Sequence, residues 1–197
     1  MSHKKYQTEA IILGNHSIGE ANRFVDMFTK DFGRLKAVAR SVREERSKLR
    51  FSLQDFSILD ISLVRGREVW RVVGANSRYN FYSKLIGRIK ERDTAVRLLS
   101  LLKRLLNGEE ENKLLFTVVY DSISFLCSNA LNNKELNDFE CLVALRILYN
   151  LGYLAKDNSN ANFLESADVT LNIMSHISPI RFDMIRQINT SLQESQL

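Results

Sequence analysis

The feature that most constrains the fold is a change of hydrophobic period near residue 80. Before that point, five short segments rich in β-branched and aromatic residues follow one another, and four of them have glycine nearby. These segments are residues 8–14, 22–30, 33–41, 57–64 and 67–75. Five strands in about 75 residues favour a small barrel over an open sandwich, and the five-stranded OB-fold barrel has this strand count.

Two connections between these segments predict hairpin turns. Both contain glycine, which adopts positive φ without steric cost: "DFG" at 31–33 and "RGRE" at 65–68. In the segment 57–64, Leu59, Ile61 and Leu63 alternate with other residues and therefore share one face of a strand. We expect that face to lie in the core of the barrel.

From about residue 80 the apolar residues recur with helical spacing. A helix is predicted within 83–108, and Gly108 is placed to end it. Its apolar stripe consists of Leu85, Ile89, Val96, Leu99, Leu102 and Leu106. A second helix is predicted within 114–131, although its β-branched residues are weaker helix formers.

The segment 137–154 is the clearest helix. Asn137 is expected to cap it with Glu140 completing a capping box, and Gly152 stands where a helix-ending glycine belongs. A last helix is expected to start at Ser178–Pro179. The predicted fold class is α+β: an N-terminal five-stranded OB-fold β-barrel, residues 1–80, is followed by a C-terminal all-helical domain, residues 81–197. Barrels of the OB type often bind nucleic acid strands, so the first domain is expected to be a nucleic-acid-binding one.

Positive charge is concentrated in the first part of the chain. The net charge is +5, yet residues 1–78 alone carry +6 and the remainder −1. Between Gly33 and Arg50 stand seven cations and two anions; the cations are Arg34, Lys36, Arg40, Arg43, Arg46, Lys48 and Arg50. Arginine is suited to bidentate contact with phosphates, so we favour a polyanion-binding surface over a merely solubilising loop.

Neighbouring residues extend this hypothesis. Arg65, Arg67 and Arg71 are expected to add to the same positive field. Trp70 and Phe51 lie close to the basic stretch and are candidates for stacking on bases, as in other strand-binding barrels. The alternative for both aromatic residues is a place in the barrel core.

No pattern typical of an enzyme is present. The chain lacks a GxxxxGK[ST] phosphate loop, a GxGxxG turn and a GxSxG elbow, and Cys127 and Cys141 form no CxxC pair. We therefore expect no catalysis, no metal site and no cofactor. The absence of a long apolar run or a signal peptide, together with two cysteines, favours a cytoplasmic protein without a membrane partner.

An ordered set of short motifs resembles the N-terminal domain of the RecO family, bacterial mediators of recombination in DNA repair. The set comprises Glu9-Ala10-Ile11, Gly19 to Arg23, Phe28-Thr29, Gly33-Arg34-Leu35, Ala37 to Arg40, the basic loop to Arg50, and Leu53 to Phe56. The similarity covers about residues 6–70, with Asp55 where the family usually has proline. The helical half matches only in general form, best at "LRILYNLGYL".

This resemblance implies a protein that binds single- and double-stranded DNA and anneals complementary strands without catalytic turnover. It implies RecR and the acidic tail of single-stranded DNA-binding protein as partners, indirect help in loading RecA, and a nucleoid-associated location. The family's DNA contacts are basic residues of the barrel, a role that falls on the seven cations between Gly33 and Arg50. Many members carry a four-cysteine zinc site after the segment matching "LGYL". Here that region, 155–172, has no cysteine, so no zinc is expected.

Two other functions agree with the same residues. An RNA-binding OB-fold protein would have a similar barrel and a similar charge. A scaffold that binds protein partners through its helices would use the basic loop only for solubility.

Overall fold

The structure is a computed structural model that describes residues 4–164 and 168–194. The chain divides into two compact units. One comprises the residues up to Lys84 together with Asn107–Asn112, and the other comprises Leu85–Leu106 and the residues from Lys113 on. We expected a single boundary at residue 80. Instead, a short helix after it and a loop far along the sequence are grouped with the strands.

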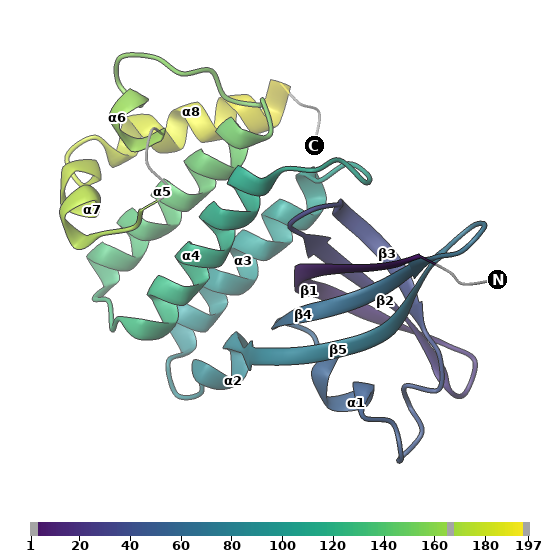
Figure 1. Cartoon of the computed structure of the whole chain (residues 1–197). Helices are drawn as coiled ribbons and strands as arrows, with labels where there is room; N and C mark the ends of the chain where they lie inside the picture. The colour runs from purple at the N-terminus through teal and green to yellow at the C-terminus, as the bar shows by residue number, and fades with distance from the viewer. Residues whose placement is uncertain (1–3, 165–167, 195–197) are drawn as a thin grey trace. The chain divides into compact units, whose positions relative to one another are not determined.

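All five predicted strands are present in the first unit (Figure 1). They are β1 (Lys5–Ile18), β2 (Asn22–Thr29), β3 (Gly33–Ala39), β4 (Ser57–Arg65) and β5 (Trp70–Asn80). Two helices of one turn belong to the same unit, α1 (Leu49–Ser52) and α2 (Phe81–Lys84). β1 begins earlier and ends later than its apolar run, because its polar ends also pair with neighbouring strands.

The strands close into a barrel in the order β1-β2-β3-β5-β4. β1 closes it by pairing antiparallel with β4 through residues 5–11 and with β2 through residues 10–18. Its register with β2 shifts between Ile12 and Gly14, and such an irregularity bends a strand. β3 and β5 run parallel, with Ala37 opposite Trp70 and Val38 opposite Arg71.

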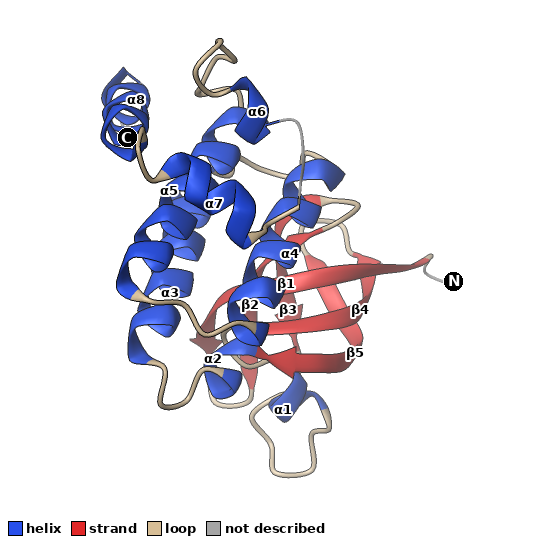
Figure 2. Ribbon diagram, turned by 90° about the vertical axis from the view of Figure 1, so that its left-hand side faces the viewer, coloured by secondary structure: helices blue, strands red, loops and turns tan. Residues whose placement is uncertain are grey.

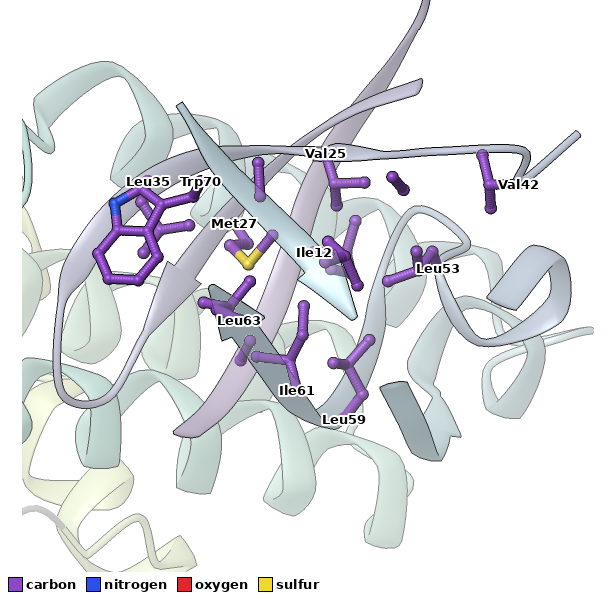
Figure 3. Packing of buried hydrophobic residues seen from close by; sticks show 14 residues of the cluster. Ile12, Val25, Met27, Leu35, Val42, Leu53, Leu59, Ile61, Leu63 and Trp70 are labelled. Atoms are coloured by element: carbon purple, nitrogen blue, oxygen red, sulfur yellow. The ribbon is translucent and has the colours of Figure 1, made fainter. Parts of the chain in front are cut away.

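Alternate residues of the strands fill the barrel (Figure 3). Leu59, Ile61 and Leu63 lie in this core, as their spacing predicted. Figure 3 shows Trp70 beside Leu35 at one end of the cluster, and Val42 and Leu53 at the other. Val42 belongs to the loop that follows β3, and Trp70 is the first residue of β5, after the β4–β5 hairpin. These two loops concern the candidate site.

In the second unit, residues 85–106, 113–164 and 168–194 are described and form six helices (Figure 2). They are α3 (Ile89–Leu105), α4 (Lys113–Ser128), α5 (Asn133–Asn150), α6 (Ala161–Leu164), α7 (Leu171–Ile177) and α8 (Arg181–Glu194). The four predicted helices correspond to α3, α4, α5 and α8, whereas α6 and α7 were not predicted. Among the helices of the described residues, none has the length and apolar character that crossing a bilayer requires.

Three predictions about helix starts are wrong. The last helix, α8, starts at Arg181 and not at Ser178–Pro179, because Ser178 ends α7. α3 starts at Ile89 because Gly87, at φ +84°, interrupts the chain before it, and Ile89 is exposed instead of joining the apolar stripe. α5 is capped by Asn132 and not by Asn137: Asn132 Oδ1 accepts from the backbone N–H of Glu135, whose carboxylate accepts from that of Asn132. The true capping box lies five residues earlier than expected. Gly152, at φ +78°, does follow the end of this helix.

A buried arginine joins α5 to α6 and to the chain beyond it. Arg146 donates from Nε to the carbonyl of Phe163 at 2.8 Å and from Nη1 to that of Asp168 at 3.0 Å. Burial lowers the pKa of its guanidinium to about 10, so the group remains cationic at neutral pH. Its hydrogen bonds to carbonyls therefore compensate a charge that has left water.

Candidate nucleic-acid interface

The basic loop between β3 and α1, residues 40–48, is fastened to the barrel at its first residues. Val42 is fully buried in the core. The backbone N–H of Arg43 donates to the carbonyl of Ala21 at 3.0 Å, and that of Ser41 donates to Asn22 Oδ1 at 2.9 Å. These contacts join the loop to the β1–β2 turn, so its charged side chains extend from a fixed base.

Six of the seven predicted cations are exposed to solvent. They are Lys36, Arg40, Arg43, Arg46, Lys48 and Arg50. Arg43 also donates from Nη1 to the carbonyl of Gly19 at 2.9 Å, which ties its side chain to the neighbouring turn. The exposure leaves these side chains accessible to phosphates, and their role in binding DNA stays a prediction.

Arg34, the seventh cation, has a structural role that contradicts its predicted one. Its Nε and Nη2 donate to Oδ1 and Oδ2 of Asp26 at 3.1 and 2.9 Å. The Asp26 side chain is only 2% exposed, and that of Arg34 is 21% exposed. Because the guanidinium compensates a buried carboxylate on the neighbouring strand, its charge is not available to a phosphate. We withdraw Arg34 from the candidate site.

Three further arginines join Arg40 around one surface pocket. The pocket has a volume of about 570 Å³, and its lining is Arg40, Arg65, Gly66, Arg67, Glu68, Val69 and Arg71. Four arginines and one glutamate thus line it. The hairpin arginines that the sequence suggested as an addition to the field are therefore brought together with Arg40.

The parallel pairing of β3 and β5 explains how Arg40 meets this hairpin. Val38 lies opposite Arg71, so the side chains of both point away from the core. Arg40 follows Val38 by two residues and leaves the same outer face. We name this cluster, Arg40, Arg65, Arg67 and Arg71, the arginine pocket.

Trp70 does not have the predicted stacking role. The side chain belongs to the core and the residue is only 4% exposed, which leaves no ring face for a base. Its ring packs against those of Tyr6 and Phe32 at centroid distances of 5.4 Å. The indole Nε1 donates to Glu109 Oε1 at 2.9 Å, as a buried indole requires a partner.

Two other aromatic residues are accessible near the cations. Phe51, in α1, is 71% exposed, so stacking by this ring stays a prediction. Phe24 was not predicted: it is half-buried on the outer face of β2, where the register places it between His16 and Val38. The alternation of β2, with Val25 and Met27 in the core, indicated that Phe24 points outward.

Potential metal ligands and the two cysteines are the other side chains that could carry chemistry, and the ligands among the described residues form no metal site. No group of three or more His, Cys, Asp or Glu side chains is arranged to hold an ion there. Neither Cys127 nor Cys141 forms a disulfide. Burial, followed by the charge of Asp138, raises the pKa of the Cys141 thiol to about 11, so it is protonated at neutral pH. The predicted absence of catalysis, metal and cofactor stays a prediction.

Comparisons with known proteins show what the N-terminal part of the chain is similar to. The family sequence model described as "Recombination protein O N terminal" matches residues 1–81. "DNA repair protein RecO" of Cutibacterium acnes is 39% identical over 64 residues, which are 32% of this chain and 26% of that protein. The protein of the same name from Nocardioides sp. is 36% identical over 107 residues, 54% of this chain and 43% of the relative. The chain thus spans less than half the length of either relative.

Proposed function

We propose, on the premise that this chain belongs to the RecO family, that it acts in DNA repair and recombination by binding DNA on its N-terminal barrel. The arginine pocket carries the proposal. Four arginines that share one hollow are held by a β-scaffold, and exposed cations of the basic loop extend the positive surface. Such a surface binds the phosphate backbone without reading sequence.

We further infer that the barrel is an OB-fold. The strand order, with β1 between β2 and β4 and with β3 parallel to β5, supports this assignment. Loops between strands are where OB-folds bind oligonucleotides. The β4–β5 hairpin lines the arginine pocket, and the turn between β1 and β2 fastens the basic loop.

Annealing follows from the same electrostatics. Two complementary strands repel one another through their phosphates, and a surface that binds both lowers this repulsion. The proposed activity is therefore the binding of single- and double-stranded DNA and the pairing of complementary strands, without catalytic turnover. The proposed partners are those of the family: RecR, the acidic tail of single-stranded DNA-binding protein, and indirectly RecA. The cytoplasmic, nucleoid-associated location stays a prediction.

The test is the annealing rate of complementary oligonucleotides across a salt series. We compare the wild type with Arg40→Glu/Arg43→Glu/Arg46→Glu. The variant should anneal more slowly. For single-stranded DNA, the slope of the logarithm of the binding constant against the logarithm of the salt concentration should be smaller in magnitude by about 2. Each of the three lost phosphate contacts contributes about 0.7 to that slope.

The matched control reverses three exposed cations of the helical unit, Arg104→Glu/Lys134→Glu/Arg186→Glu. It has the same net charge as the test variant and should anneal nearly as fast as the wild type. Equal loss in both variants would mean that only total charge matters. No acceleration by the wild type would refute the annealing activity, and preferential binding of a matched RNA competitor would refute the assignment to DNA. If the wild type binds no DNA and the loop variant still binds the protein partners, the alternative of a scaffold that binds partners through its helices is favoured.

A further inference from the structure

The loop Asn107–Asn112 connects α3 to α4 in sequence, yet it belongs to the same compact unit as the barrel. It carries three consecutive carboxylates, Glu109, Glu110 and Glu111. We name it the acidic loop. Its position beside a basic candidate site raises the question of which cations its carboxylates neutralise.

Three contacts seat the acidic loop against the barrel. The backbone N–H of Arg34 donates to the carbonyl of Gly108 at 3.2 Å. At Gly33 the backbone of Glu110 approaches so closely that a Cβ would lie 2.1 Å from its carbonyl oxygen. Gly33 also has φ +64°, so glycine is required there for two independent reasons. The third contact is the hydrogen bond from Trp70 Nε1 to Glu109.

Glu109 connects this seat to the arginine pocket. Its Oε1 accepts the indole hydrogen bond, and its Oε2 lies 3.8 Å from Nη2 of Arg65. The guanidinium of Arg65 in turn lies over the Trp70 ring, 5.4 Å from its centroid. Arg65 lines the pocket and its side chain is 67% exposed. The carboxylate therefore faces a cation that a phosphate is expected to use.

We propose that Glu109 is a built-in competitor of phosphate: its carboxylate, held by Trp70, pairs with Arg65 and weakens the binding of nucleic acid at the arginine pocket. A bound phosphate has to displace or share this carboxylate. An exposed ion pair of this length is weak, so the competition adjusts affinity without abolishing it. The inference rests on the proposed function, because it concerns the same pocket.

The decisive variant is Glu109→Gln. The amide oxygen of glutamine can still accept the Trp70 hydrogen bond, whereas the negative charge beside Arg65 is lost. We expect the Kd for a single-stranded oligothymidylate at low salt to fall about two- to fivefold. The salt slope should steepen by about 0.7, the contribution of one additional phosphate contact.

Glu110→Gln is the matched control, since it removes the same charge from the neighbouring exposed position of the loop. It should have a much smaller effect. In an Arg65→Gln background, Glu109→Gln should change nothing, because the two groups act through each other. Equal effects of Glu109→Gln and Glu110→Gln, or weaker binding by Glu109→Gln, would overturn the proposal.

A second probe separates this proposal from the DNA-binding function. Trp70 is the single tryptophan of the chain and touches Glu109, so its fluorescence reports on ligands near Arg65. Inorganic tripolyphosphate should bind more tightly to Glu109→Gln than to the wild type in this assay. If it does and neither protein binds DNA, the competitor stands and the DNA function falls. If DNA binds equally well to both proteins, the competitor falls and the function stands. If neither probe binds, both fall.

Discussion

The replacement of Arg34 by methionine separates a structural arginine from those that we propose bind DNA. Methionine keeps much of the apolar length of the side chain but removes both hydrogen bonds to Asp26. The carboxylate then stays buried without its compensating charge. Breaking a buried pair costs about 3–5 kcal/mol, and because Arg34 is 21% exposed we expect about 3 kcal/mol.

Urea unfolding followed by Trp70 fluorescence measures this loss, because Trp70 lies in the barrel core and reports on that unit. With an m value of about 2 kcal/mol/M, the midpoint should fall by about 1.5 M. The matched variant Arg46→Met changes an exposed loop residue and should unfold within about 0.5 kcal/mol of the wild type. Asp26→Asn/Arg34→Met should recover part of the loss, because no buried charge remains.

The salt dependence of DNA binding completes the experiment. Folded Arg34→Met should keep the slope of the wild type, while Arg46→Met should lower it by about 0.7 for single strands. An Arg34 variant of unchanged stability but reduced slope would refute the structural role and restore Arg34 as a phosphate ligand.

Three other predictions concern the barrel and the helical unit. Phe51→Ala should leave stability nearly unchanged, because the ring is exposed. If the ring stacks on a base, the same change should raise the Kd for single-stranded DNA by about tenfold. An unchanged Kd, measured by fluorescence anisotropy, would exclude stacking. Arg78→Met should lower the free energy of unfolding in urea by about 1 kcal/mol. Arg78 bridges Glu9 and Asp60, two carboxylates that lie directly opposite each other on β1 and β4. An unchanged free energy of unfolding would mean that solvent screens these charges fully. For Cys141, the folded pKa of about 11 lies above the ordinary value of 9.0, so the contribution of this thiol to stability is fully present below pH 9 and is lost as pH rises toward 11. Cys141→Ala should therefore show a smaller fall of stability between pH 9 and 11, and identical profiles would contradict this.

The sequence by itself determined the strands and their faces. Alternation placed Leu59, Ile61 and Leu63 in the core, and the glycines indicated where the chain turns, because both signals depend on neighbouring residues. The concentration of cations in one stretch was equally visible. Helix starts were less reliable: Asn132 and Asn137 both precede an acidic residue by three positions, and only the folded chain shows which of the two caps the helix.

The tertiary structure alone decided what each basic or aromatic side chain contacts. Arg34 and Arg46 are alike in the sequence, but pairing of β2 with β3 brings Arg34 to a buried Asp26 while Arg46 remains in solvent. Trp70 is a core residue because its ring packs against Tyr6 and Phe32, and the partner of its indole N–H, Glu109, comes from a loop 39 residues away. The charge of a side chain and the strand face on which it lies are local properties, whereas the partner that neutralises a charge or covers a ring comes from non-local contacts. For this reason the sequence located the candidate surface, and the fold selected which of its residues are available to bind.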